Sequence, residues 1–513
     1  MQTGCQAAAE CGEEQVSQGK SKVSLSRSAD SECQGACVSP SNLERVQHVH
    51  EGYVGDLVRS TCFLMFLSPY RRPIWRRAIR VVIVTLSLLF LLDIVQLFSA
   101  YKTFSTNLAA GTVYDYDELP HVLQDQKIYI AAQFWTSEYV LWDQWMAALL
   151  SLVKVLGPRN VYVSILESGS LDGTAALIHY LDGKLEELNV ERTIIIDPTT
   201  HEDLVNGSPY NKDGSEKNGW IFTSNSTPPH TKELRRIPYL ADVRNKGLEP
   251  LVELRRETGR VFDKILYLND VYFATSDVLS LLATNAGHYD VACGLDFHYP
   301  PAFYDTFAVR DTDKRGPVMS VFPYFQAKTT REALLQGLPA RVTSCWNGML
   351  AVDAAPYYDV PAKTADGSST STPGLRFRGL PDSLAVMGLE ASECCLIHAD
   401  LIARKQAQKG IFINPAARSG YERAAWDLTH LPPDDNFVSL YQYISGVYHM
   451  RFARWKIDGV SSSAGQNMRR IYEKIAGWTD TGKALGETRE EVGDYCAIEE
   501  MHILIWNGWK HVW

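Results

Sequence analysis

The segment Lys264–Val271, K-I-L-Y-L-N-D-V, places an apolar run directly before an amide and a carboxylate. A short apolar run of this kind is typical of a strand that is buried in a parallel sheet. Ligands of open α/β sheets bind where such strands end. Asp270 is therefore well placed to hold a divalent cation against a diphosphate. The alternative is a strand followed by a helix cap, because Asn and Asp are common at that position.

Strands and helices alternate around this segment, which indicates an α/β fold with a mainly parallel central sheet. The expected strands are 128–132, 160–166, 193–196, 265–268 and 290–293, and the expected helices are 139–156, 174–188, 240–257 and 277–283. In the helix 139–156, Trp142 and Trp145 are expected on the apolar side. Residues 197–230 read as a long polar loop.

The composition is that of a globular protein, with 45% hydrophobic and 21% charged residues in 513 positions. This length is enough for a large core and for more than one domain. The formal net charge of −10 argues against general nucleic-acid binding.

Residues 81–98 form the stretch best suited to cross a membrane, reaching roughly 27 Å at about 1.5 Å per residue. A buried core helix is the alternative. Five arginines precede the stretch, namely Arg71, Arg72, Arg76, Arg77 and Arg80. By the positive-inside rule, the N-terminus is then cytosolic and the bulk of the chain lumenal. We therefore expect a signal anchor at 79–100, with the acceptor sequons at Asn206 and Asn225 on the lumenal side.

The remaining boundaries follow from composition. Residues 1–70 are rich in Ser, Gln, Gly and Glu and are expected to form a disordered cytosolic tail. Residues 101–125 are expected to form a stem, 126–450 the main α/β domain, and 451–513 a C-terminal extension with helices and aromatic residues.

Two further segments would suit a nucleotide. Glu167 lies at the end of a predicted strand, and small residues connect it to the helix that begins at Asp172. The backbone N–H groups of such a turn can face a nucleotide. An ordinary capped turn is the alternative. Arg244 and Asn245 lie near the start of a helix, where the Arg fork suits a phosphate. A solvated helix face is the alternative there.

Asp296 follows the strand near 291–295 and would bind acceptor hydroxyls. Trp346 offers an indole face to a sugar ring, and Asn347 offers an amide to its hydroxyls, although Asn347 could equally cap a turn.

Residues 393–400, E-C-C-L-I-H-A-D, combine several polar groups, and 395–397 are taken as extended. His398 would complete a cation site, whereas the alternative is a satisfied core histidine. The literal strings Asp115-Tyr116-Asp117 and Asp311-Thr312-Asp313 lack a strand directly before them and are not expected to bind the metal.

Five segments, in this order, make the chain resemble the fungal α-1,3-mannosyltransferases of glycosyltransferase family 69, which include cryptococcal capsule enzymes and capsule-associated proteins. They are V-S-I-L-E-S-G-S-L-D-G-T (163–174), R-R-I-P-Y-L-A-D-V-R-N (235–245), K-I-L-Y-L-N-D-V (264–271), F-R-G-L-P-D-S-L (377–384) and S-E-C-C-L-I-H-A-D (392–400), followed by I-N-P (413–415). The resemblance implies a GT-A-like nucleotide-binding fold in 126–450. It also implies a type II Golgi membrane protein that uses GDP-mannose and transfers mannose to an α-mannoside with retention. Such transferases normally carry Asp-x-Asp, whereas here Asn269 stands in place of the first acid.

The hypothesis is thus a membrane-anchored mannosyltransferase that depends on a divalent cation, Mn²⁺ or alternatively Mg²⁺. Asp270 and His398 would hold the metal. The nucleotide sugar would be bound by Glu167, Asp172, Arg244, Asn245 and Asn269, and the acceptor by Trp346 and Asn347. Either Glu393 or Asp296 would stabilise the cationic sugar. The rival hypothesis is a non-catalytic capsule or wall-assembly factor that keeps the fold and binds glycans or partner proteins.

Overall fold

The computed structural model describes residues 72–113, 119–223, 231–300, 302–363, 369–431, 436–459 and 463–512. The predicted cytosolic tail, the Asn225 sequon and the string Asp115-Tyr116-Asp117 lie outside these residues. The chain divides into two compact units, of which one is Ala8–Gln96 and the other consists mainly of Leu97–Trp513.

Within the described part of the first unit, the chain is helical. It forms the N-terminal part of helix α2 (Arg72–Gly111), whose apolar side chains between Val81 and Val95 are largely exposed. The described residues contain two helices that are long and apolar enough to cross a membrane, Trp75–Gly111 and Glu138–Leu156. The second is half buried in the larger unit, as a core helix would be. The predicted span at 79–100 is therefore a helix of sufficient length and apolarity.

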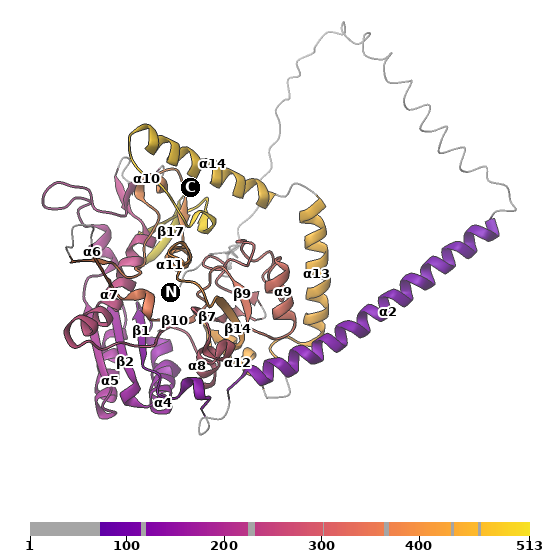
Figure 1. The fold of residues 1–513 in the computed structure, drawn as a ribbon, viewed down its shortest axis with the longest axis horizontal. Coiled ribbons are helices and arrows are strands. Elements are labelled where there is room, and N and C mark those ends of the chain that lie inside the picture. Colours follow the sequence, from indigo (N-terminus) through magenta and orange to yellow (C-terminus); the bar gives the residue numbers. More distant parts are fainter. Residues whose placement is uncertain are drawn as a thin grey trace, which may run out of the picture. The chain divides into compact units, whose positions relative to one another are not determined.

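The larger unit contains a nine-stranded sheet in the order β3-β2-β1-β6-β10-β7-β14-β9, with β8 paired to β7 (Figure 1). Its strands are β1 (Ile128–Phe134), β2 (Val161–Ser168), β3 (Glu191–Asp197), β6 (Lys264–Leu268), β7 (Val291–Tyr299), β8 (Ala302–Phe303), β9 (Ala340–Val342), β10 (Met349–Asp353) and β14 (Ile411–Gly420). Strands β3, β2, β1 and β6 are parallel neighbours, and so are β7 and β14. Strand β10 is antiparallel to both β6 and β7. The predicted α/β class with a mainly parallel sheet is confirmed.

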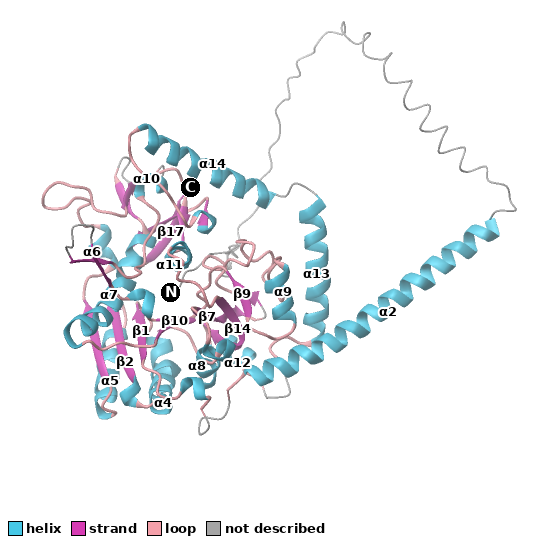
Figure 2. Ribbon diagram, in the orientation of Figure 1, coloured by secondary structure: helices cyan, strands magenta, loops and turns pink. Residues whose placement is uncertain are grey.

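Alternate side chains of each strand enter two separate cores, as the pleat requires. In β1, Ile128 and Ile130 pack against α4 (Met146–Leu156), α5 (Thr174–Glu187) and α8 (Thr275–Leu282). Tyr129 and Ala131 enter the other core, together with residues of α7 (Arg236–Thr258). Figure 2 shows these helices in cyan against the magenta strands. Burial on both faces explains why the central strands read as apolar runs.

Three local predictions are wrong. Residues 395–397 are not extended, because they belong to helix α11 (Glu393–Ala403), whose start is capped by the Ser392 hydroxyl accepting from the Cys394 N–H. Trp142 is 71% exposed, since a π-helical turn at Leu141–Trp145 precedes α4 and rotates it away from the core. Asp296 lies inside β7 rather than after it.

The predicted loop 197–230 contains regular structure in its described part. Helix α6 (His201–Val205) begins with a capping box at Thr200, and strand β4 (Trp220–Phe222) pairs with β5 (Lys232–Leu234). The other described elements are α3 (Glu138–Val140), α9 (Lys328–Leu335), β11 (Val360–Lys363), β12 (Ser369–Thr372), α10 (Asp382–Ala385), β13 (Glu390–Ala391), α12 (Arg423–Thr429) and β15 (Ala497–Ile498), besides short 3₁₀ turns.

The segment predicted as a stem is helical as far as Gly111. Its side chains Phe104 and Leu108 are buried in the larger unit, and the Tyr101 hydroxyl donates to the Val438 carbonyl at 3.0 Å. The first turns after residue 100 are thus packed on the domain.

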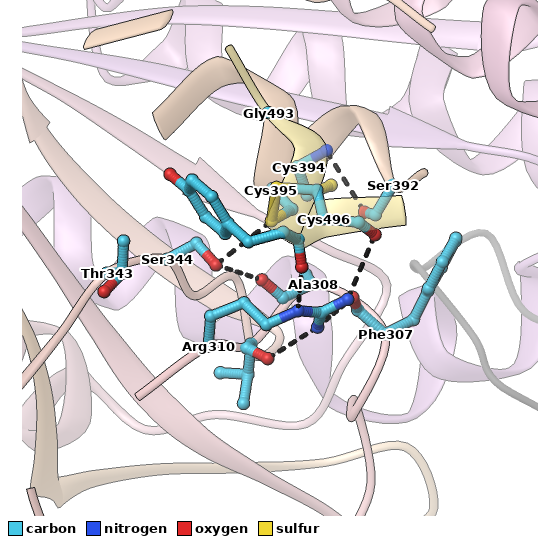
Figure 3. The surroundings of a disulfide bond; sticks show 12 residues. Phe307, Ala308, Arg310, Thr343, Ser344, Ser392, Cys394, Cys395, Gly493 and Cys496 are labelled. Carbon is cyan, nitrogen blue, oxygen red and sulfur yellow. Dashed lines mark hydrogen bonds between the residues drawn. A yellow bond between two sulfur atoms is a disulfide. The ribbon is translucent and has the colours of Figure 1, made fainter. Parts of the chain in front are cut away.

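The C-terminal region contains α13 (Leu440–Gly459), α14 (Ser463–Ala484) and the hairpin β16 (Met501–Ile505) and β17 (Gly508–Val512). A disulfide joins Cys496, shortly before this hairpin, to Cys395 of α11 (Figure 3). Beside it, the Arg310 guanidinium donates to the carbonyls of Tyr495 and Cys496 at 2.8 and 3.0 Å. The C-terminal region is therefore held to the α/β domain by a covalent bond and by buried hydrogen bonds.

Candidate functional site

Polar side chains gather at one edge of the sheet. Because β10 is antiparallel to both β6 and β7, the carboxyl ends of β6 and β7 point the same way. Asn269 and Asp270 follow β6, Asp296 lies near the end of β7, and Asn347 precedes β10. The topology thus brings together residues that are distant in the sequence, at the edge where open α/β sheets bind ligands.

Two cavities lie at this edge, and Gln133 lines both. The larger, of about 30 Å³, is lined by Gln133, Phe134, Trp135, Ser168, His201, Arg236, Tyr239, Leu240, Val243, Leu504, Gly508 and Trp509. The smaller, of about 10 Å³, is lined by Ala131, Ala132, Gln133, Arg244, Gly247, Tyr267, Leu268 and Asn269. The first cavity therefore extends from the ends of β1 and β2 to the C-terminal hairpin, and the second lies between β1, β6 and α7.

Several nitrogen atoms of residues that line these cavities have no hydrogen-bond partner within the described part of the chain. The Trp135 Nε1, Arg244 Nη2 and Asn269 Nδ2 atoms are buried and lack a hydrogen-bond partner among the described residues. The orientation of the Asn269 amide is fixed, since its Oδ1 accepts from the Trp346 indole at 3.1 Å. Buried donors are normally satisfied. A lining of unmatched N–H groups suits a ligand that is rich in oxygen and negative charge.

Arg236 supplies a positive charge to the wall of the larger cavity. Its guanidinium carbon lies 4.6 Å from the centre of the Trp509 ring. Burial lowers the pKa of Arg236 to about 10, so the group remains a cation near neutral pH. Arg236 belongs to the same segment as Arg244, R-R-I-P-Y-L-A-D-V-R-N (235–245), but sequence reasoning selected only Arg244. The missed signal was a second arginine in the first turn of a helix beside the sheet edge.

Trp135 and His201, which line the same cavity, stack on each other with ring centres 4.2 Å apart and planes at 11°. Burial, and then the charge of Arg236, lower the pKa of His201 to about 4, so the imidazole is neutral at physiological pH. Sequence reasoning missed both residues, because no local pattern connects the end of β1 with α6.

Three of the predicted nucleotide-binding residues make hydrogen bonds to backbone groups of the protein. The Glu167 carboxylate accepts from the Ser170 N–H at 2.6 Å, and Asp172 accepts from the N–H groups of Thr174 and Glu138 at 3.1 Å. The Asn245 amide makes a two-way pair with the backbone of Phe377, at 2.8 and 2.9 Å. These contacts explain the local fold, and a role in nucleotide binding stays a prediction.

Asn269 and Asp270 are fixed by residues from other elements. The Asn269 carbonyl accepts from the Trp145 indole at 2.9 Å, and its side chain accepts from Trp346. The Asp270 carboxylate accepts from the Ser137 hydroxyl at 3.1 Å. The strand end is thus rigidly positioned beside the smaller cavity.

Arg244 and Glu393 form a buried ion pair, with 2.9 Å between Nε and Oε1. The Arg244 guanidinium also lies 4.1 Å from the Trp346 ring centre. Trp346 is only 1% exposed and Asn347 is fully buried. Trp346 therefore packs beneath Arg244, and the acceptor-binding role expected of both residues stays a prediction.

Asp296 and Asp305 are a pair of fully buried acids. Asp296 Oδ1 accepts from the Asn347 amide at 3.1 Å and from the Asp305 N–H at 3.2 Å. Burial raises the pKa of Asp296 to about 6. Burial and the charge of Asp296 also raise the pKa of Asp305. Asp305 was missed by sequence reasoning, because the short strand β8 before it was not predicted from the sequence.

The backbone at Asn347 and Gly348 takes two consecutive left-handed conformations, with φ of 57° and 71°. A Cβ at Gly348 would lie 2.5 Å from the Ser419 hydroxyl oxygen. This turn is what directs the Asn347 amide at Asp296.

The two predicted metal ligands differ in their surroundings. Asp270 offers one carboxylate at the sheet edge, which fits a cation whose other ligands come from a diphosphate and water. His398 is enclosed in α11, where burial lowers its pKa to about 3, and neither ring nitrogen has a hydrogen-bond partner among the described residues. Within those residues, the group of three metal-ligating side chains that comes together is Glu500, His502 and His511. The assignment of Asp270 and His398 stays a prediction.

The fold and the site define an α/β protein with polar groups and two cavities at the carboxyl ends of its strands, the edge where open α/β sheets bind ligands. Residues 127–400, just over half of the chain, match the family described as cryptococcal mannosyltransferase 1. The chain belongs to this family and is thereby a glycosyltransferase of the mannosyltransferase type. No curated protein matches the chain.

Among solved structures, the chain is similar to glucosyl-3-phosphoglycerate synthase of M. tuberculosis, with 12% identity over 66% of this chain and 86% of that chain and a TM-score of 0.27. It is similar to residues 1–349 of S. aureus TarS, with 12% identity over 70% and 83% and a TM-score of 0.30. It is also similar to the mannosyltransferase PcManGT of Pyrobaculum calidifontis in complex with GDP-Man and Mn²⁺, with 10% identity over 76% and 89% and a TM-score of 0.28. With TM-scores of this size, the functional argument rests on the family and on the site.

Proposed function

We propose that this chain is a retaining α-1,3-mannosyltransferase that moves mannose from GDP-mannose to an α-mannoside acceptor. The observation that supports this most directly is the set of unmatched N–H donors on Trp135, Arg244 and Asn269 around two adjoining cavities. A nucleotide diphosphate sugar presents the oxygens and the negative charge that such a lining requires.

The residues that line the larger cavity would contact the nucleoside diphosphate. The stacked rings of Trp135 and His201 would offer an outer ring face to a base, since such stacking tolerates any base. Arg236 would pair the diphosphate, because a guanidinium matches phosphate oxygens with two parallel hydrogen bonds. Specificity for GDP-mannose is the part of this proposal that comes from the family.

The residues that line the smaller cavity would contact the sugar and its leaving phosphate. Arg244 and Asn269 are two of these residues, and each has a buried donor without a hydrogen-bond partner among the described residues. Asp270 directly follows Asn269. When bound, a divalent cation, Mn²⁺ or Mg²⁺, would neutralise charge on the GDP leaving group, with Asp270 as its protein ligand. The protein's own contribution is positioning and electrostatics, which is what a retaining transfer needs.

We assign Asp296 rather than Glu393 as the carboxylate that stabilises the cationic sugar. Glu393 is engaged by Arg244 and so acts as the residue that positions that guanidinium. Asp296 is held by Asn347 and by the Asp305 N–H, and its Oδ2 has no hydrogen-bond partner among the described residues. Asn347 and Trp346 then serve as positioning residues behind Asp296 and Arg244.

The proposed location is the Golgi membrane, with the large unit on the lumenal side. The apolar helix α2 supplies the anchor. Disulfides join Cys293 to Cys345 and Cys395 to Cys496, and such bonds persist in the oxidising secretory pathway.

The test uses the full chain, purified in detergent, with GDP-mannose and a short α-mannoside. We expect a mannosylated product whose new bond is α-1,3, and we expect turnover to stop when EDTA is added. Mass and NMR analysis of the product give its composition and linkage. Absence of both turnover and GDP binding would support the rival assembly factor, and phosphate in the product would indicate a phosphosugar transferase.

A second test addresses Asp270. The variant Asp270→Ala should lose far more than threefold in activity, because a catalytic cation contributes several kcal/mol. The matched control is Asp213→Ala, an exposed aspartate on a loop, which should retain activity. Activity of Asp270→Ala within about threefold of wild type would refute the metal assignment.

A further inference from the structure

The C-terminal hairpin brings three metal-ligating side chains together outside the family match. His502 of β16 and His511 of β17 are directly paired across the antiparallel ladder, so their side chains share one face. Glu500 directly precedes β16. The hairpin lies beyond residue 400, where the family match ends.

One carboxylate oxygen connects the three groups. Glu500 Oε2 lies 3.1 Å from His502 Nε2 and 3.3 Å from His511 Nδ1. The ligand atoms of the three residues all lie within 4.8 Å of one another. Ligand atoms placed about 2.0–2.2 Å from a tetrahedral or octahedral ion are separated by about 3.0–3.4 Å, which matches the two measured distances.

We propose that Glu500, His502 and His511 hold a divalent first-row transition-metal ion. Two imidazoles and one carboxylate suit ions of the series from Mn²⁺ to Zn²⁺ and do not suit Ca²⁺, which prefers oxygen ligands. Burial of one ligand and partial exposure of the others leave coordination positions for water or a substrate oxygen. His502 is fully buried, whereas the side chains of His511 and Glu500 are 27% and 30% exposed.

The site is rigidly built. The His502 ring lies between aromatic neighbours, with its centre 5.2 Å from Phe307 and 4.8 Å from Trp509. The disulfide at Cys496 holds the chain shortly before Glu500. Backbone pairing between Arg235 and Ile503 ties β16 to the start of α7. Preorganisation of this kind favours a metal site over a flexible surface cluster.

The hairpin also forms part of the larger cavity, through Leu504, Gly508 and Trp509. Trp509 contacts both the metal-ligating cluster and Arg236. Its ring centre lies 4.6 Å from the His511 ring centre and 4.6 Å from the Arg236 guanidinium carbon. A bound cation would therefore add a second positive charge near Arg236, and a diphosphate is the chemical group that would balance both. This role in donor binding rests on the proposed function, whereas metal binding by the hairpin does not.

The closing experiment measures binding of Zn²⁺ and Co²⁺ alone to the full chain in detergent, without nucleotide. We expect one ion per chain, and Co²⁺ should give visible d–d absorption. Glu500→Gln and His511→Ala should weaken binding at least tenfold. The control His179→Ala removes an exposed histidine of α5 and should bind as the wild type does. No stoichiometric binding, or unchanged affinity in both hairpin variants, would overturn the proposal.

Two further measurements separate this inference from other effects. Glu500→Gln keeps an oxygen acceptor for both imidazoles, so the metal-free variant should melt like the metal-free wild type while losing the metal. Asp270→Ala should keep the hairpin ion, since the two positions are independent. A chain that binds the ion but never transfers mannose would refute only the proposed function. A chain that transfers mannose but binds the ion equally well in all hairpin variants would refute only this inference.

Discussion

Arg235 and Arg244 are both buried, and each pairs with a glutamate, yet they use their donors differently. Arg235 donates to Glu390 at 3.1 and 2.6 Å, and its Nη1 donates to the Leu380 carbonyl and to Asp382 at 2.8 and 2.7 Å. Arg244 donates to Glu393 through Nε, while its Nη2 has no hydrogen-bond partner among the described residues. The first guanidinium is saturated by the protein, and the second borders a cavity.

This difference distinguishes an arginine that stabilises the fold from an arginine that is available to a ligand. A buried arginine whose nitrogens are all matched by the protein has no donor left for a ligand, and its removal leaves an uncompensated buried charge. An arginine with a donor directed at a cavity retains capacity that only a ligand can fill. The same sequence segment, R-R-I-P-Y-L-A-D-V-R-N, supplies both kinds.

The greatest effect on folding is expected from Arg235→Ala. Glu390 is fully buried and would lose its partner, so the free energy of unfolding should fall by about 3–5 kcal/mol. Chemical denaturation, followed by circular dichroism, measures this loss. Arg256→Ala, at an exposed position of α7, which begins directly after Arg235, is the matched control and should change stability little. A loss below about 1 kcal/mol would show that the saturated ion pair is not what holds this region.

Arg244→Lys tests the arginine that borders the cavity. Lysine keeps a charge for Glu393 but removes the second guanidinium nitrogen and the stacking on Trp346. We expect kcat/KM for GDP-mannose to fall by about a hundredfold, close to 2.7 kcal/mol, with a smaller loss of stability than Arg235→Ala shows. Lys246→Ala, at a partly exposed position of α7, serves as the control. Equal losses of stability in the two arginine variants would contradict the distinction.

The variant Asp296→Asn should show how much the buried pair of acids lowers the free energy of unfolding near neutral pH. Burial raises the pKa of Asp296 from 3.8 to about 6, so between these values the folded state binds more protons than the unfolded state. Wild-type stability attributable to Asp296 therefore falls as pH rises through this window. The asparagine variant should lack this dependence and be more stable at pH 7 by about 1–2 kcal/mol.

The measurement is the difference in unfolding free energy between wild type and Asp296→Asn at several pH values. If Asp296 also stabilises the cationic sugar, activity should drop while stability rises. Asp213→Asn, at an exposed position, should change neither. A variant that is less stable at pH 7 than the wild type would show that the ionised Asp296 is favourable in the fold.

The smallest effect on activity is expected from Asn206→Gln, because Asn206 lies on the surface whereas the two compared arginines are buried. Asn206 is exposed at the end of α6, and its sequon is glycosylated only if this unit enters the lumen. Expression in a secretory host should give a wild-type chain whose electrophoretic mobility increases after glycosidase treatment. The variant should show a smaller increase, with unchanged activity. Identical glycosidase shifts would mean that this sequon is not used.

Sequence patterns were sufficient to predict the central strands, because a strand that is buried on both sheet faces has a continuous apolar sequence. The strand 265–268 appears as β6, and the helix expected at 240–257 appears within α7. The pattern failed at 395–397, where a buried helix and a buried strand have the same apolar composition. It also failed at Trp142, since helical periodicity does not foresee a π-helical turn.

For the site, the sequence singled out Asn269, Asp270 and Arg244, because the first two directly follow a strand that the sequence predicts and the third lies in a predicted helix. Their role in binding stays a prediction. The sequence could not identify Trp135, His201, Arg236 or Trp509, which come from four segments that meet only around the cavity. It also left the C-terminal residues without a role, whereas the structure pairs His502 with His511 across a hairpin.

The sequence by itself determined a helix that is long and apolar enough to cross a membrane, the α/β class and the family, because these depend on local apolar runs and contiguous motifs. Only the tertiary structure decided which polar groups are used by the protein and which remain for a ligand. That distinction depends on contacts such as Arg235 with Glu390, or Trp346 with Asn269, between residues far apart in the chain. Hydrogen-bond satisfaction is a property of three-dimensional neighbours, and it is what sets the matched Arg235 apart from the open donor of Arg244.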